Sequence, residues 1–154
     1  MRVRLLAVLV AAALAAINVS SVFAATGPGG GNADLGLEAV TISGGTVIAK
    51  TGQVTLAGSI TCTQDLDASV FVDLAQVVGR FNTIRGFGDA SVSCLAAEGS
   101  ATFTVSFFAD QGKFAPGAAR VQAFAETGFC NDVDCFFDDA LYGPASIRLV
   151  GSSG

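Results

Sequence analysis

Short segments in which apolar and polar residues alternate are the feature that most constrains how this chain folds. In GQVTLAGSITC, residues 52–62, Val54, Leu56 and Ile60 share one side and the residues between them share the other. Alternation with a period of two places successive side chains on opposite faces of a β-strand. The same pattern recurs in SATFTVSFF, GAARVQAFAE and PASIRLV. Each segment therefore predicts a strand with one buried face.

The number of such segments favours an all-β fold. Further strands are expected in LEAVTIS, TVIAK, SVFVDLAQVV and DASVSCLA, which are bounded by Gly, Asp and Pro turn signals. Nothing after the first two dozen residues sustains a helical repeat. About seven to nine short strands are typical of an antiparallel immunoglobulin-like β-sandwich, and a small β-barrel is the alternative. We expect the sandwich to occupy residues 37–150, followed by a flexible tail at 151–154.

MRVRLLAVLVAAALAAINVSSVFA, residues 1–24, has the pattern of a secretory signal peptide. Arg2 and Arg4 precede an apolar region, and Ala24 ends a cleavage-site pattern. The apolar run of about 13 residues is shorter than the roughly 20 that a helix needs to cross a bilayer, so no stable membrane insertion is expected. The Gly-rich stretch 25–36 predicts a flexible leader. We therefore expect an exported, secreted bacterial protein.

The charge and the missing residue types exclude several functions. Loss of Arg2 and Arg4 with the signal leaves six Lys and Arg against thirteen Asp and Glu, a net charge of −7. An acidic chain without a basic cluster is a poor nucleic-acid binder. The chain has no His, so a Ser-His-Asp or Cys-His mechanism is impossible. We expect no enzyme and no cofactor; an enzyme that uses carboxylates or one of the two lysines, Lys50 and Lys113, is the weakest alternative.

The four cysteines predict two disulfides. Disulfides form in exported proteins, and four cysteines allow three connectivities. Pairing of Cys62 with Cys94 and of Cys130 with Cys135 requires no strand to cross another, so we favour it over the other two.

CNDVDCFFDD, residues 130–139, also invites a metal or acid/base interpretation. Zinc is disfavoured because the cysteine spacing lacks a nearby second pair or a His, and a redox pair would more typically be C-x-x-C. Paired carboxylates for glycoside hydrolysis lack the signs of a sugar cleft. We predict a disulfide-stapled hairpin without a metal. Calcium is the weaker alternative, and its ligands would be Asp132, Asp134, Asp138 and Asp139.

Several phenylalanines fall on the polar side of their strands or in loops. They are Phe71, Phe108, Phe124, Phe136 and Phe137. Strand ends, bulges and loops that cover them are one explanation. The other is an exposed apolar patch or cleft for a hydrophobic ligand or a protein partner.

Two resemblances attach to these motifs. GQVTLAGSITC, SVSC, KFAPGAARVQAFA and SIRLV resemble a family of small secreted bacterial immunoglobulin-like domains of unknown function, over about residues 38–150. CNDVDCFFDDALYGPASIRLV is similar to the end of the neocarzinostatin-type antitumour antibiotic chromoproteins, in which a cleft beside an immunoglobulin-like sandwich holds an apolar chromophore. This chain departs from that pattern because Cys62 and Cys94 enclose a long loop, where those proteins have a short disulfide loop.

These observations together favour a secreted, non-catalytic binding module that is a monomer. Its partner would be an extracellular protein or, as the chromoprotein resemblance implies, a small apolar ligand.

Overall fold

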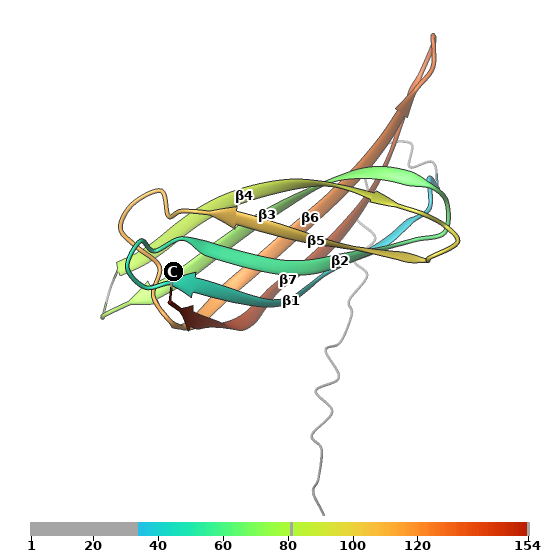
Figure 1. The fold of residues 1–154 in the computed structure, drawn as a ribbon. Coiled ribbons are helices and arrows are strands. Elements are labelled where there is room, and N and C mark those ends of the chain that lie inside the picture. Colours follow the sequence, from blue (N-terminus) through green and yellow to red (C-terminus); the bar gives the residue numbers. More distant parts are fainter. Residues whose placement is uncertain (1–33, 81, 154) are drawn as a thin grey trace, which may run out of the picture.

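A computed structural model describes residues 34–80 and 82–153 of the chain (Figure 1). The predicted signal peptide, residues 1–24, and residues 25–33 of the predicted leader lie outside the described residues. The described part is all β, and no helix in it is long and apolar enough to cross a membrane. The strands are β1 (Leu37–Ile48), β2 (Val54–Cys62), β3 (Leu66–Val78), β4 (Asn82–Cys94), β5 (Ser100–Phe107), β6 (Gly117–Cys130) and β7 (Cys135–Ser152).

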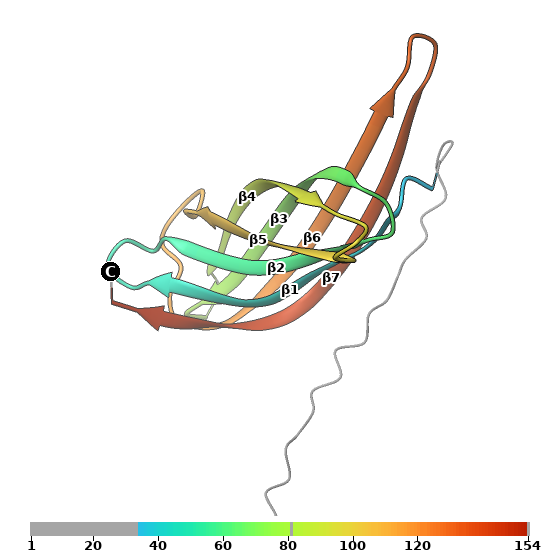
Figure 2. The ribbon, with the colours of Figure 1, turned by 45° about the vertical axis from the view of Figure 1, so that its right-hand side comes forward.

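All seven strands belong to one hydrogen-bonded sheet in the order β4-β3-β6-β7-β1-β2-β5. Every neighbouring pair is antiparallel except β1 and β7, which pair in parallel from Gly45↔Leu149 to Ile48↔Ser152. The sheet curls on itself, so that β4 and β5 pass close to each other (Figures 1 and 2). The all-β class and the disulfide pairing are as predicted. The expected antiparallel sandwich is not confirmed, because the parallel β1–β7 ladder joins all the strands in one mixed, nearly barrel-shaped sheet.

Two glycines allow β4 to approach β5. A Cβ atom added at Gly88 would lie 2.5 Å from Cδ1 of Phe107 and 2.5 Å from Cγ1 of Val105. The N–H of Asp110 donates a hydrogen bond of 2.8 Å to the carbonyl oxygen of Arg85 beside the second glycine, Gly86. Glycine in a strand often marks a close approach of this kind. The two ends of the strand order therefore meet by side-chain packing and this backbone hydrogen bond rather than by a ladder.

The hydrophobic core fills the inside of the curled sheet. The alternating segments place their apolar residues there as predicted, and Val54, Leu56 and Ile60 are fully buried. The disulfide between Cys62 of β2 and Cys94 of β4 is also buried, with 6.2 Å between the Cα atoms.

β7 is longer than its sequence indicates. The expected strand covered only residues 144–150, whereas β7 runs from Cys135 to Ser152 and so includes the first residues of the predicted tail. Gly143 has a positive φ of 86°, and the β6–β7 register shifts between Val121 and Ala123. A bulge therefore absorbs the Gly-Pro sequence, which otherwise predicts a break.

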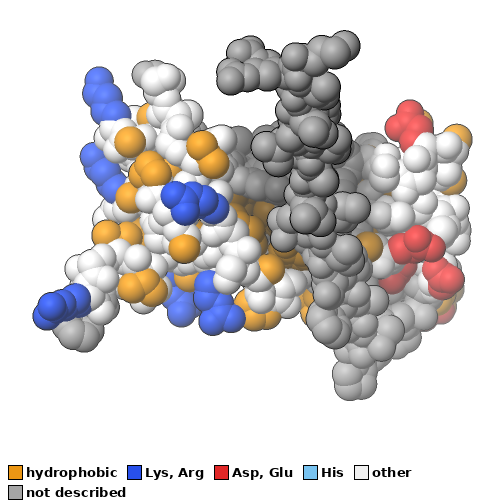
Figure 3. Space-filling model, turned by 90° about the horizontal axis from the view of Figure 1, so that it is seen from below, with side chains coloured by type: hydrophobic (Ala, Val, Ile, Leu, Met, Phe, Trp, Pro, Cys, Tyr) orange, Lys and Arg blue, Asp and Glu red, His pale blue; other side chains and the backbone are white. Residues whose placement is uncertain are grey.

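The charged side chains are divided between the two ends of the molecule. We call the end with the β1–β2, β3–β4 and β5–β6 connections the basic end. All the Lys and Arg side chains of the described residues lie on it or on the adjoining half of the sheet: Lys50, Arg80, Arg85, Lys113, Arg120 and Arg148. Most acidic side chains lie towards the opposite end. Figure 3 shows this separation of blue from red side chains on one face.

Candidate binding surface: the hairpin arm and the groove at its base

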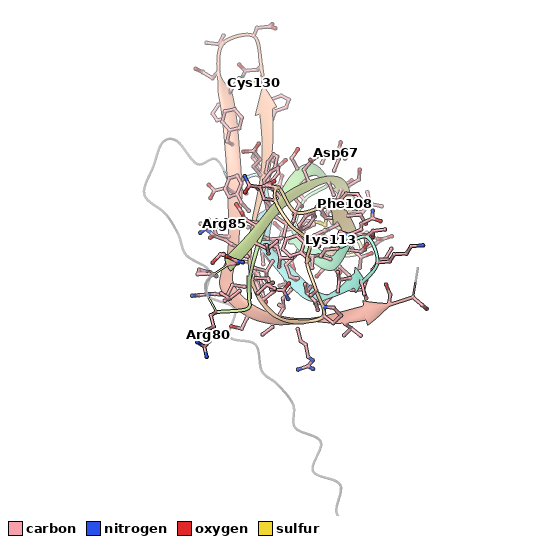
Figure 4. All side chains as sticks on the ribbon, turned by 90° about the vertical axis from the view of Figure 1, so that its left-hand side faces the viewer. Asp67, Arg80, Arg85, Phe108, Lys113 and Cys130 are labelled. Carbon is pink, nitrogen blue, oxygen red and sulfur yellow. A yellow bond between two sulfur atoms is a disulfide. The ribbon has the colours of Figure 1, made fainter. Side chains whose placement is uncertain are left out.

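The far ends of β6 and β7 leave the sheet together as a two-stranded arm (Figure 2). β3 pairs with β6 only as far as Ser69↔Glu126, whereas β6 and β7 stay paired as far as Cys130↔Cys135. We call residues 127–138 the arm, and Cys130 marks its outer part in Figure 4. Beyond Glu126, the β6 edge of the arm therefore has no strand partner among the described residues.

The tip of the arm is held by a disulfide and a capped turn. Cys130 and Cys135 are bonded, with 4.0 Å between their Cα atoms. Oδ1 of Asn131 accepts hydrogen bonds from the N–H groups of Val133 (2.9 Å) and Asp134 (2.7 Å). An isolated two-stranded hairpin is only marginally stable in water. The cross-link and the asparagine cap therefore stabilise a ribbon to which the described part of the chain adds no third strand.

The base of the arm is fixed to the sheet by two polar side chains. Oδ2 of Asp138 accepts hydrogen bonds from the N–H groups of Leu35 (3.1 Å) and Leu37 (3.0 Å). On the other strand, the buried hydroxyl of Thr127 donates to the carbonyl oxygen of Asp67 at 2.7 Å. These contacts anchor both strands of the arm where it leaves the sheet.

Apolar side chains occupy both faces of the arm. Phe137 lies opposite Gly128 on the outer face, where a Cβ atom at Gly128 would lie 2.8 Å from its ring. Phe129 and Phe136 pair on the other face, which continues the core face of the sheet. Phe129 is 60% exposed. Phe137 and Val133 of the arm are exposed as well, so the arm presents several large apolar side chains rather than one.

An open groove of about 660 Å³ lies between the arm and the body of the sheet. Gly128 and Phe129 line it on the arm side, and Leu66 and Leu95 line it on the body side. Carboxylates of the β2–β3 segment also line it. Asp65 accepts a hydrogen bond from the N–H of Ala96 at 2.8 Å, and Asp67 accepts one from the hydroxyl of Ser93. The groove thus combines an apolar floor with an acidic side.

The five phenylalanines predicted as ligand-binding residues do not converge on one site. Phe71 and Phe124 stack on the outer face of the sheet, with 6.3 Å between ring centroids. Phe136 and Phe137 lie on opposite faces of the arm, and the exposed Phe108 lies at the basic end. None of the five lines the groove. A ligand-binding role for them stays a prediction.

The four aspartates of the calcium alternative are also spread out. Asp132 and Asp134 lie in the turn at the tip, and Asp138 binds backbone N–H groups at the base. Asp139 is exposed and pairs with Glu126 in the β6–β7 ladder. Within residues 34–80 and 82–153, no group of three or more His, Cys, Asp or Glu side chains could hold a metal ion.

Sequence reasoning missed two of the aromatic side chains on these surfaces. Phe87 stacks on Phe71, with 6.1 Å between ring centroids, but β4 was expected to start only at Asp89. The alternation of Phe87 with Gly86 and Gly88 was the available signal. Phe129 lay beyond the last alternating segment of β6, so its side could not be assigned.

Comparisons with known proteins add little to this geometry. No protein-family model matches the chain, and no curated protein matches it. Among solved structures, the solution structure of CsgH from R. palustris is similar, with 21% identity over 69% of this chain and 91% of that chain. Its TM-score of 0.35 supports no conclusion about fold or function. The two resemblances drawn from sequence motifs therefore stay predictions.

Proposed function

We propose that this chain is an exported, non-catalytic binding module that takes an extended segment of another polypeptide along the β6 edge of the arm. The observation that carries the proposal is the edge beyond Glu126, which no strand of residues 34–80 and 82–153 pairs with and which lies directly beside the groove. In β-strand addition, main-chain hydrogen bonds to an exposed edge provide affinity, and pockets for alternate side chains provide specificity. The arm offers the edge, and the groove offers the pocket.

The lining of the groove defines the chemistry of the partner segment. Every second side chain of an added strand would point towards Leu66, Leu95 and Phe129, so these positions should be apolar. Asp65 and Asp67 lie on the side of the groove, and their charge disfavours acidic residues in the partner. The expected segment therefore alternates apolar residues with basic or neutral polar ones.

The residue types near the groove support a binding role rather than catalysis. The sequence has no His, and its two lysines, Lys50 and Lys113, lie together at the basic end, where Nζ of Lys113 donates to the carbonyl oxygen of Lys50 at 3.1 Å. The groove holds carboxylates and the hydroxyl of Ser93, which donates to Asp67, and neither a His nor a Lys lines it to activate that hydroxyl. Two disulfides are compatible with an extracellular or periplasmic location.

A peptide titration tests the proposal. The probe is a fluorescent peptide of alternating Val and Lys. The control peptide has the same sequence, with every second backbone nitrogen methylated. We expect the oxidised protein to bind the first and to bind the second at least about tenfold more weakly, because N-methylation removes the main-chain donors. Phe129→Ser should weaken binding of the first peptide by about tenfold.

Phe108→Ser is the matched control, because Phe108 is 55% exposed and lies at the basic end. It should leave the affinity unchanged. Equal binding of the two peptides would show that main-chain pairing plays no part, and an equal loss in the two Phe variants would place the binding elsewhere.

A carrier of a small apolar ligand is the second candidate. The volume of about 660 Å³ lies within the range of ligand pockets, about 300 to 1,000 Å³. An apolar dye whose binding depends on Phe129, together with no binding of the Val-Lys peptide, would favour the carrier.

A further inference from the structure

The connections at the basic end form one continuous surface, because the β5–β6 connection contacts its neighbours. Nζ of Lys113 in this connection donates to the carbonyl oxygen of Lys50 in the β1–β2 turn, at 3.1 Å. A Cβ atom added at Gly151, near the end of β7, would lie 3.1 Å from Cγ of Pro116 in the same connection. The backbone hydrogen bond described above joins the connection to β4. Figure 4 looks onto this end of the molecule.

Cations are gathered on this surface in two rows. The first row has one cation in each connection: Lys50, Arg80 and Lys113. The second row lies behind it on the adjoining half of the sheet: Arg85, Arg120 and Arg148. All six side chains are exposed. These residues are far apart along the chain, so the sequence shows no basic cluster, and the fold brings them to one end.

Few carboxylates oppose these cations. Asp110 lies in the β5–β6 connection, and Asp73 of β3 lies diagonally opposite two arginines of the second row. The terminal carboxylate of the chain, one residue beyond Ser153, adds one negative charge. The next carboxylate along the strands is that of Asp89, seven residues or about 23 Å from the start of β4. That distance exceeds two screening lengths at physiological salt, so the basic end is locally positive although the chain is acidic.

Large apolar side chains stand among the cations. Val77 and Val78 precede Arg80 in the β3–β4 hairpin, and Val77 is 67% exposed. Phe108 opens the β5–β6 connection, and Val150 lies near the end of β7; both are exposed. Figure 3 shows orange side chains between the blue ones at this end. The surface thus combines positive charge with exposed apolar groups, a combination that marks an interaction site.

We propose that the basic end docks on the surface of an anionic phospholipid bilayer. The Lys and Arg side chains would contact lipid phosphates, and Val78 and Phe108 would enter the boundary between headgroups and acyl chains. A polyanion in solution would pair with the cations but leave the apolar side chains in water. A bilayer needs no fitted pocket for apolar side chains that stand on three separate elements. It therefore matches both properties of the surface.

This inference goes beyond the proposed function and uses the opposite end of the molecule. The docking is peripheral, so it agrees with the expectation of no stable membrane insertion. β3 has 13 residues and spans about 40 Å, and the arm leaves the sheet at the far end from the basic connections (Figure 2). A docked molecule would hold the arm and its groove away from the bilayer. Either proposal can fail without the other.

Co-sedimentation of the oxidised protein with lipid vesicles tests the docking. Vesicles of phosphatidylglycerol and phosphatidylcholine in equal parts should bind the protein at least about tenfold more tightly than vesicles of phosphatidylcholine alone. Rising salt should weaken this binding several-fold, because it screens the charges. K50Q/K113Q should weaken it by about tenfold or more, and K50R/K113R, which keeps both charges, should retain it.

The matched control for net charge is A97E/S100E, which changes it by the same amount at exposed positions of the opposite end. This variant should bind the anionic vesicles as the wild type does. Phe108→Ser should weaken vesicle binding several-fold, and Phe129→Ser on the arm should not. Thermal unfolding would establish that each variant is folded.

The absence of binding to anionic vesicles overturns the proposal. So does equal binding to the two kinds of vesicle, an equal loss in K50Q/K113Q and A97E/S100E, or unchanged binding of Phe108→Ser. Polyglutamate that binds the basic end, together with no binding of vesicles, would overturn it in favour of an acidic polypeptide.

Discussion

The carboxylate of Asp138 accepts a hydrogen bond from the backbone N–H of Leu37 at 3.0 Å, and so joins residues 101 positions apart. The parallel β1–β7 ladder covers only Gly45 to Ile48 of β1. At the start of β1, the link to β7 is therefore a side chain rather than a ladder. The same contact fixes the base of the arm, so the geometry of the candidate binding edge depends on one carboxylate.

Asp138→Ala should lower the free energy of unfolding by about 2 kcal/mol, because two N–H groups lose a charged acceptor. Hydrogen exchange should accelerate at the amides of Leu35 and Leu37. Asp139→Ala is the matched control, since Asp139 is the neighbouring exposed carboxylate, and it should change neither quantity. Equal effects of the two substitutions would show that net charge, rather than the hydrogen bonds, matters here.

Gln76 is 3% exposed and ties β3 to the β5–β6 segment. Its Nε2 donates to the carbonyl oxygens of Ala115 (2.7 Å) and Ala118 (3.3 Å), and its Oε1 accepts from the N–H of Ala115 (2.9 Å). Gln76→Ala should cost about 3 kcal/mol in urea unfolding, because it leaves backbone groups without partners. Gln122→Ala, on an exposed position of β6, should cost less than about 0.5 kcal/mol. Similar urea midpoints of unfolding for the two variants would contradict a stabilising role for the hydrogen bonds of Gln76.

The two disulfides should differ in what they stabilise. Loss of Cys62–Cys94, with a sequence separation of 32, should cost about 3.5 kcal/mol of global stability in the chain-entropy view. Loss of Cys130–Cys135, with a separation of 5, should cost about 2 kcal/mol at most, and this cost should fall on the local stability of the arm. Its effect should be confined to the arm, as faster amide exchange with little change in Tm. A global loss from C130S/C135S as large as that from C62S/C94S would refute the distinction.

Gly88→Ala tests the approach of β4 to β5. The added methyl would lie 2.5 Å from both Phe107 and Val105, so we expect a loss of about 2 kcal/mol or more. Gly44→Ala is the matched control in β1, because a Cβ there meets nothing within 4 Å. Thermal unfolding of both variants decides the matter. An unchanged Tm for Gly88→Ala would mean that the two edges are not in contact.

The sequence predicted local structure well where alternation was uninterrupted. Strand β2 and the inward side of Val54, Leu56 and Ile60 followed from period two alone. So did the outward position of Phe71, because Val70 and Val72 on either side of it are fully buried. Disulfide pairing followed from the order of the strands and the predicted export signal.

Three features could not be predicted because they depend on contacts distant in sequence. Parallel pairing of β1 with β7 has no signature in the sequence of either strand. Yet this pairing joins β4-β3-β6-β7 to β1-β2-β5, and without it the strands would form two separate sheets. The predicted fourth strand begins only at Asp89, because glycines such as Gly86 and Gly88 are typical of loops. In the structure these two glycines lie within β4 and allow its close approach to β5. The groove forms because the ladder between β3 and β6 ends at Ser69↔Glu126. No property of either strand alone marks that point.

Site-resolved hydrogen exchange of the oxidised protein, with and without the alternating Val-Lys peptide, would decide whether the arm accepts an added strand. We predict that saturating peptide slows exchange at amides of Gly128 to Cys130 and leaves the β1–β2 turn at the basic end unchanged. The N-methylated peptide should produce no such protection. Protection that appears only outside the arm, or none at all while the peptide is bound, would contradict strand addition at the β6 edge.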